Sequence, residues 1–353
     1  MIKPSEEIKI KYYGFSLTKR AFIVMYSLTI IGCLAPAIYF YYNPLNPKIF
    51  NHIPDNFHWM FKNIPLLSGI WALITVIEAQ FIWYRFAKKQ LRIIEDLKSN
   101  LEIKNKEILD SIEYALRIQT AILPPQKIVE KYLENSFILY KPKDIVAGDF
   151  YWMENIGDLV LFAACDCTGH GVPGAMVSVV CHNALNRAVR EFGLIQPAAI
   201  LDKTTEIVVE NFSKSEEEIQ DGMDISICAL NLKSKTIEWA GANNPLWLII
   251  NNDLIETKAD KQCIGYNSHL KPFTNHQYTL ESNTNIYLFS DGFSDQFGGK
   301  PEKKLTKNRF KEILLSIQHL PLRQQAIELD KFISNHQKGT EQTDDILVIG
   351  IKV

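Results

Sequence analysis

The stretch LVLFAACDCTGHG, residues 159–171, joins an unbroken apolar run to an aspartate and a glycine-rich turn. A continuous apolar run of this kind is typical of a strand that is buried on both faces. Asp166 ends the run, and Gly169 and Gly171 lie in the turn that follows. The stretch therefore predicts a strand over residues 158–166 that carries a carboxylate to the end of a sheet.

Apolar runs of the same kind predict the other strands of the domain. They are residues 137–140, 223–231, 236–240, 246–251, 285–290 and 346–353. Helical periodicity occurs in two pairs of segments, residues 174–192 with 198–212, and residues 307–317 with 322–335. Strands and helices do not alternate strictly, and no glycine-rich dinucleotide loop follows the first strand. We therefore expect an α/β domain built as a two-sheet β-sandwich flanked by helices, not a doubly wound sheet.

Aspartates stand at the ends of several predicted strands, beside glycine turns or the next strand. Asp149 follows a glycine, Asp291 precedes one, and Asp344 lies just before the last strand. Any one of them could simply hold a turn, where aspartate is common. As a set they offer carboxylate and carbonyl oxygens, which Mg²⁺ and Mn²⁺ prefer as ligands. The pattern therefore predicts a site for hard divalent cations.

Five motifs occur in a characteristic order along the chain. They are GDFYW (148–152), DCTGHGVPGA (166–175), GANNPL (241–246), SDGFSDQFGG (290–299) and TDDILVIGI (343–351). In this order they resemble the metal-dependent serine/threonine phosphatases of the PPM (type 2C) superfamily, and most closely its bacterial SpoIIE-like branch. The resemblance covers residues 111–353 and implies a β-sandwich with helices on both outer faces, in agreement with the predicted strands.

Carried over position by position, the resemblance implies two divalent metal ions, Mn²⁺ or Mg²⁺. The implied ligands are Asp149, Asp166, Asp291, Asp344 and the backbone carbonyl of Cys167, with Asp166 bridging the ions. The implied reaction is hydrolysis of phosphoserine or phosphothreonine by metal-activated water, without a nucleophilic side chain.

Two features depart from the family pattern. The arginine that binds the substrate phosphate in type 2C enzymes has no clear counterpart, and Lys141 or Lys143 could take its place. His170 follows Asp166 by four residues, whereas the eukaryotic enzymes place a histidine two residues after the aspartate. His170 is thus either a general acid or a residue that caps the loop.

The remaining motif positions also have two interpretations. Asp224, Asp295 and Gly292 belong either to a further, weaker metal position or to turns. Asn243 and Asn244 lie either in a substrate-binding surface or in the turn before a proline.

Two apolar segments precede this domain. Residues 21–42 carry no charge, and residues 65–86 carry only Glu78 and Arg85. Each segment is long enough to cross a bilayer as a helix. Two other interpretations stay open: a lipoprotein signal that is cleaved before Cys33, and a soluble helical hairpin.

The basic residues predict an orientation for these spans. They gather in segment 1–20 and directly after residue 84, whereas the loop 43–64 holds only Lys48 and Lys62. By the positive-inside rule the loop faces outward, and both the N-terminus and the phosphatase domain face the cytoplasm. The prediction is a multi-pass protein of the bacterial cytoplasmic membrane.

Residues 87–123 connect the membrane to the domain. They lack glycine and proline, and they are rich in good helix formers. A heptad register places Ile94, Leu101, Ile108, Ala115 and Ile122 at a, and Leu97, Lys104, Ser111 and Ile118 at d. This half-polar seam predicts a parallel homodimeric coiled coil, and a single helix packed on the next domain is the alternative. Pro124 then begins the phosphatase domain, residues 124–353.

The composition of the chain limits the classes of function that fit it. A net charge of −2 gives no indication of nucleic-acid binding, and the six cysteines lack zinc-site spacing. We expect an enzyme that acts on a phosphorylated signalling protein, such as an anti-sigma-factor antagonist. The alternative is a catalytically weak or inactive module that binds a partner at the membrane. The full set of four aspartates favours the enzyme, because their like charges repel without a metal.

Overall fold

The computed structural model describes residues 27, 31, 54–213, 220–266, 270–299 and 302–353. It divides into two compact units, Met1–Asn105 and Lys106–Val353. The predicted N-terminal segment and nearly all of the predicted first span, residues 21–42, lie outside the described residues.

The first long described element is α3, Asp55–Ile122, a single helix of 68 residues. It takes in residues 55–64 of the predicted loop, then the whole of the predicted second span and nearly all of the predicted linker. Within the described part of the chain, α3 is the one helix long and apolar enough to cross a membrane, through its part from Leu66 onward. Helical structure is therefore shown here, while membrane insertion and pairing of two copies stay predictions.

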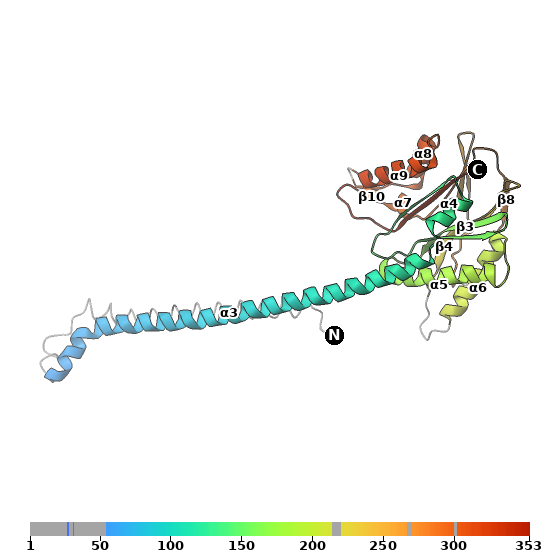
Figure 1. The fold of residues 1–353 in the computed structure, drawn as a ribbon. Coiled ribbons are helices and arrows are strands. Elements are labelled where there is room, and N and C mark those ends of the chain that lie inside the picture. Colours follow the sequence, from blue (N-terminus) through green and yellow to red (C-terminus); the bar gives the residue numbers. More distant parts are fainter. Residues whose placement is uncertain (1–26, 28–30, 32–53, 214–219, 267–269, 300–301) are drawn as a thin grey trace. The chain divides into compact units, whose positions relative to one another are not determined.

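Two five-stranded antiparallel sheets form the centre of the unit Lys106–Val353 (Figure 1). The first sheet has the order β1 (Ser136–Lys141), β12 (Ile346–Lys352), β9 (Asn285–Phe289), β6 (Leu246–Ile250) and β7 (Asp253–Thr257). The second has the order β2 (Phe150–Ile156), β3 (Leu159–Cys167), β4 (Met223–Asn231), β5 (Thr236–Ala242) and β8 (His276–Thr279). A small separate hairpin consists of β10 (Phe297–Gly298) and β11 (Lys303–Lys304).

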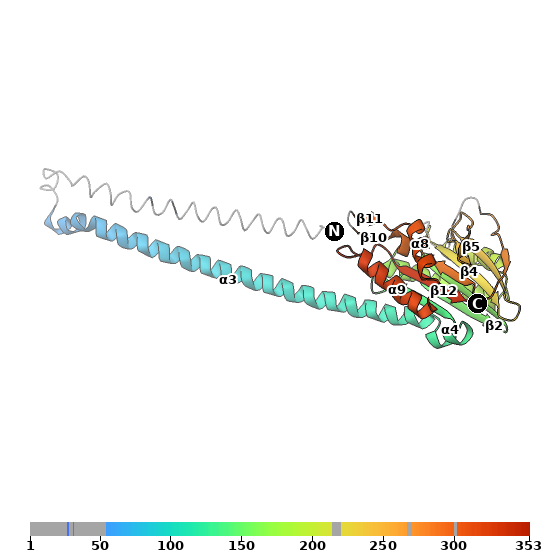
Figure 2. The ribbon, with the colours of Figure 1, turned by 90° about the horizontal axis from the view of Figure 1, so that it is seen from above.

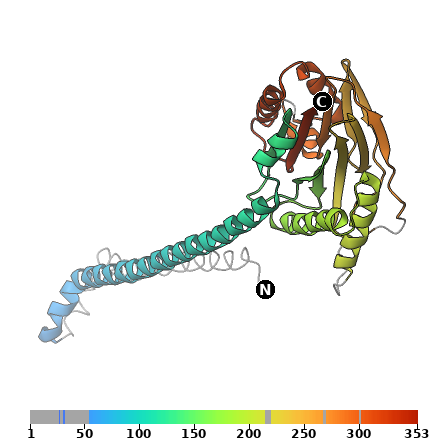
Figure 3. The ribbon, with the colours of Figure 1, turned by 45° about the vertical axis from the view of Figure 1, so that its right-hand side comes forward.

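Helices cover both outer faces of this sandwich (Figure 3). The second sheet packs against α5 (Gly171–Arg190) and α6 (Pro197–Phe212). The first sheet packs against α8 (Lys307–Ile317) and α9 (Leu322–His336), which lie in front of β12 in Figure 2. Two short helices are α4 (Gln126–Tyr132) and α7 (Gly292–Asp295).

Three apolar clusters hold the layers together. Residues such as Phe162, Leu248 and Leu347 fill the space between the sheets. Separate clusters lie between each sheet and its helix pair. Burial of this apolar surface is the main force that stabilises such a layered domain. The predicted two-sheet sandwich with flanking helices is confirmed.

The strands that the sequence did not predict are edge or hairpin strands. β2, β7 and β8 lie at sheet edges, and their side chains are partly exposed. Such strands need no continuous apolar run, so they lack the signal that marks a buried strand. The seven predicted strands and four predicted helices are all present, with ends shifted by at most a few residues.

Candidate active site

The antiparallel registers bring several strand ends to one side of the sandwich. In the first sheet, Lys141 pairs with Ile346 at the end of β1 and the start of β12. In the second sheet, the start of β2 pairs with the end of β3, where Asp166 stands opposite Asp224. The loops that carry the predicted aspartates therefore all leave from neighbouring strand ends.

The predicted metal ligands influence one another electrostatically across the two sheets. Burial, and then the charge of Asp166, hold the pKa of Asp149 well above its usual range. Burial, and then the charges of Asp291 and Asp224, raise the pKa of Asp166 in the same way. The pKa of Asp291 rises to about 6, mainly through burial and also through the nearby charge of Asp344. Like charges thus gather where little water can screen them.

This arrangement fits a cation. The side chain of Asp149 is 3% exposed, and its Oδ2 atom is buried without a hydrogen-bond partner. The oxygen atoms around it belong to carboxylate and carbonyl groups, which are the ligands that Mg²⁺ and Mn²⁺ prefer. Within the described residues, no three His, Cys, Asp or Glu side chains form a ready metal-binding group. The metal ligands named from the sequence therefore stay a prediction.

Glycines allow the loops of this site to touch. A Cβ atom on Gly148 would lie 2.2 Å from the carbonyl oxygen of Gly169 and 3.2 Å from that of Cys167. A Cβ atom on Gly292 would lie 1.9 Å from the carbonyl oxygen of Asp345. No side chain fits at either position, so these glycines set how closely the acidic loops approach.

Asp345 organises the loop that leads to Asp149. Its Oδ1 accepts a hydrogen bond from the backbone N–H of Lys143 at 2.7 Å. Its Oδ2 accepts from the backbone N–H groups of Gly148 at 2.6 Å and Asp149 at 3.3 Å. Asp345 is not among the residues predicted for the site, although it stands beside Asp344 in the last motif.

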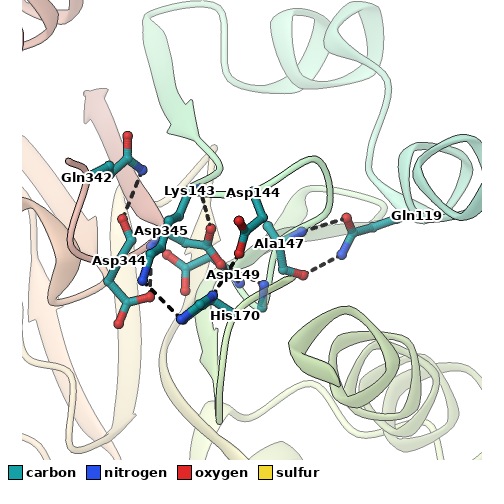
Figure 4. A network of polar contacts seen from close by, with 10 residues as sticks. Gln119, Lys143, Asp144, Ala147, Asp149, His170, Gln342, Asp344 and Asp345 are labelled. Atoms are coloured by element: carbon teal, nitrogen blue, oxygen red, sulfur yellow. Dashed lines mark hydrogen bonds and ion pairs between the residues drawn. The ribbon is translucent and has the colours of Figure 1, made fainter. Parts of the chain in front are cut away.

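Three polar side chains, Lys143, His170 and Asp144, contact one another in a row at the same loops (Figure 4). The Nζ atom of Lys143 lies 3.0 Å from Nε2 of His170, whose Nδ1 lies 2.7 Å from Oδ2 of Asp144. Because a lysine ammonium can only donate, Nε2 accepts and the ring proton sits on Nδ1, facing Asp144. In this arrangement Nε2 carries no proton.

Comparison with known proteins identifies the fold and the family. The family Stage II sporulation protein E (SpoIIE) matches residues 157–353, more than half of the chain. The chain belongs to the SpoIIE family. It is a PPM-type protein serine/threonine phosphatase. A comparison with curated proteins found no match.

Solved structures agree with this assignment. The SiaA-PP2C domain of Pseudomonas aeruginosa is 31% identical, with a TM-score of 0.65, over 70% of this chain and 98% of that one. The phosphatase domain of SpoIIE from Bacillus subtilis, solved with a fragment of its regulatory domain, is 17% identical with a TM-score of 0.51. That match covers 62% of this chain and 63% of the other. The RsbU and RsbW domains of a Mycobacterium tuberculosis protein are 17% identical, with a TM-score of 0.50, over 62% of this chain and 59% of that one. The last two likenesses concern the fold alone.

The other predicted residues of this SpoIIE-family site have structural partners. The Lys141 ammonium group forms an ion pair with Asp330 on α9, so this lysine is not free to bind a substrate phosphate. Asp295 forms an ion pair with Lys304 at 2.6 Å. Of the two candidate lysines, only Lys143 therefore remains with the acidic loops.

The turn before β6 holds two more predicted residues. Asn243, at a positive φ of 55°, donates from Nδ2 to Oδ1 of Asp224 at 2.8 Å. Asn244 is buried, and its Nδ2 atom has no hydrogen-bond partner. Asn243 thus supports Asp224, which stands opposite Asp166.

Gln119, near the end of α3, joins the helix to the acidic loops. Its Nε2 donates to the carbonyl oxygen of Ala147 at 2.6 Å and to Oγ of Ser178 on α5 at 3.1 Å. Its Oε1 accepts from the backbone N–H of Ala147 at 3.1 Å. The sequence carried no signal for this residue, because a glutamine in a helix usually faces solvent.

Proposed function

We propose that this SpoIIE-family phosphatase is a metal-dependent enzyme of the bacterial cytoplasmic membrane that acts on a phosphorylated signalling protein. The supporting observation is the gathering of buried aspartates at the strand ends, one with an unpaired oxygen. Such a group is unfavourable in the folded chain unless a cation neutralises it.

In this proposal Asp149, Asp166, Asp291 and Asp344 and the carbonyl group of Cys167 hold two Mn²⁺ or Mg²⁺ ions. Bound metal would lower the pKa of water and neutralise charge on the phosphoryl group. The chain itself supplies the positioning. Asp345 fixes the backbone before Asp149.

The proposal is tested by phosphate release from a phosphoserine protein by the full-length chain. We expect turnover with Mn²⁺, none after chelation by EDTA, and recovery when Mn²⁺ is returned. A phosphotyrosine protein should be a poor substrate. Turnover that is indifferent to EDTA would contradict the metal proposal. Binding of the phosphoprotein without turnover would favour the inactive, partner-binding module.

Membrane anchoring is supported by the surface of α3. Large apolar side chains along its first half are exposed, among them Leu66, Trp71, Ile77 and Phe81. Exposed apolar surface of this extent is typical of contact with lipid or with another chain. A reporter that is active only outside the cytoplasm should be active when fused after Asp55 and silent after Asn105 or Val353. An active fusion at Val353 would contradict the proposed orientation.

The linker is proposed to form a homodimer. Its seam positions Ile94, Leu97, Leu101 and Ile108 are all exposed in the single chain. A second copy would cover them as a coiled coil does.

A further inference from the structure

Lys143 is held at the acidic site by its backbone. Its N–H donates to Asp345, the same carboxylate that accepts from Gly148 and Asp149. The start of its side chain is therefore fixed relative to the loop of a proposed metal ligand. The side chain is half-buried, and its ammonium group reaches His170.

His170 is in turn fixed by Asp144. The Asp144 carboxylate accepts from Nδ1 of the ring, and Nε2 then presents a lone pair to the Lys143 ammonium group. The loop of Asp144 also rests on the start of α5, since a Cβ atom on Gly171 would lie 3.0 Å from Oδ2 of Asp144. An ammonium group has three N–H donors, so two of them stay available for another acceptor.

Beside the proposed metal ions, a cation of the chain itself would offset the repulsion between the substrate phosphate and the four carboxylates. Of the lysines near these loops, Lys141 pairs with Asp330 and Lys304 pairs with Asp295. Lys307 acts on Asp224 and Asp291 through its charge. Lys143 differs from the two paired lysines because its ammonium group contacts a histidine nitrogen and not a carboxylate.

We propose that Asp144 and His170 position the Lys143 ammonium group to bind the phosphate of the substrate. Lys143 is then the phosphate-binding cation of this site, and His170 is a positioning residue instead of a general acid. The inference rests on the proposed function of the same site.

The test uses the full-length chain with saturating Mn²⁺ and two readouts. Calorimetry gives the Kd for inorganic phosphate, and steady-state kinetics give KM and kcat for p-nitrophenyl phosphate and for a phosphoserine peptide. Lys143→Ala should raise both the phosphate Kd and KM by about tenfold or more, because a charge-assisted contact is lost. Lys143→Arg should restore most of the binding.

His170→Ala should change the same quantities in the same direction, by a smaller factor. The double variant should be no worse than Lys143→Ala alone, because the histidine acts through the lysine. Lys233→Ala, which removes an exposed lysine paired with Asp158 at 2.6 Å, is the matched control and should behave as wild type. Thermal melting checks that each variant is folded.

Two results would overturn the inference. In the first, His170→Ala leaves the phosphate Kd unchanged and slows only the phosphoserine peptide, whose poor leaving group needs a general acid. In the second, Lys307→Ala weakens phosphate binding and Lys143→Ala does not. If instead no phosphate ester is turned over but phosphate binding still depends on Lys143, the proposed function fails and the inference stands.

Discussion

Two adjacent aspartates in the last motif have different tasks. Asp345 is 2% exposed and accepts three backbone hydrogen bonds from the loop between β1 and β2. Asp344 accepts a hydrogen bond from the backbone of Asp345, and its charge raises the pKa of Asp149, Asp166 and Asp291. One residue therefore builds the loop, and the other contributes negative charge to the site.

Substitution separates these tasks. In Asp345→Asn one acceptor oxygen becomes an NH₂ group that faces backbone donors. The free energy of unfolding should fall by about 1–3 kcal/mol, because this is the cost of a buried donor without a partner. Asp344→Asn should leave stability nearly unchanged and weaken Mn²⁺ binding. Urea denaturation and Mn²⁺ titration measure the two effects, and equal loss of stability in both variants would contradict this division.

The buried carboxyls also predict how stability depends on pH without metal. The folded chain binds the protons of Asp149, Asp166 and Asp291 more tightly than the unfolded chain, because their pKa values are raised. This stabilisation is complete below the usual aspartate pKa of about 4 and is lost as the pH rises through the folded values, which for Asp291 is about 6.

The melting temperature of the full-length chain in EDTA should therefore fall between pH 5 and pH 8, and Mn²⁺ should restore it at pH 8. Asp291→Asn should reduce the fall in melting temperature, whereas the control Asp253→Asn, at an exposed aspartate, should not. A melting temperature that rises over this range would show that the carboxyls are not a source of instability.

At the scale of elements, the sequence could predict the buried strands but not the partly exposed strands at the sheet edges. Continuous apolar runs marked β3, β4 and β12, and the motif order placed the carboxylates at strand ends. β7 and β8 are partly exposed and lack such runs. The tasks of Asp345, Asp144 and Gln119 depend on hydrogen bonds between residues far apart in the chain, which no local pattern contains.

Gln119 links α3 to the loop before β2 and to α5, and replacing its side chain should weaken both contacts. In Gln119→Ala the carbonyl and N–H groups of Ala147 lose their partner, and so does the link to Ser178. We expect a loss of about 2–3 kcal/mol in stability and weaker Mn²⁺ binding, because the freed loop carries Asp149. Gln126→Ala, which removes an exposed contact to Glu130, is the control. Unchanged Mn²⁺ affinity in Gln119→Ala would mean that α3 does not support the site.

At the scale of the whole molecule, one helix belongs to both compact units, since α3 runs through the boundary at Asn105. Its proposed dimer seam is half polar at the d positions, with Lys104 and Ser111. A marginal seam can shift between two states that differ by a few kcal/mol, whereas a strong one is locked. We propose that this linker passes a membrane signal to the phosphatase domain.

The double substitution Lys104→Leu and Ser111→Leu should therefore strengthen the dimer and move basal phosphatase activity clearly in one direction. Insertion of four residues after Leu101 should change the phase between membrane and domain. Activity is measured at equal metal and protein concentration in the same detergent. Wild-type rates in both variants would reduce the linker to a tether.

The central claim is that the buried aspartates bind the metal on which phosphatase activity depends, and Asp166→Asn tests it most directly. The measurement is Mn²⁺ stoichiometry by calorimetry on the full-length chain, together with phosphate release from a phosphoserine protein. We predict two Mn²⁺ ions per wild-type chain. The variant should lose at least one ion and more than about a thousandfold of kcat, which is above 4 kcal/mol of transition-state stabilisation, with an unchanged or higher melting temperature. Near-normal turnover of Asp166→Asn at saturating Mn²⁺ would contradict the account.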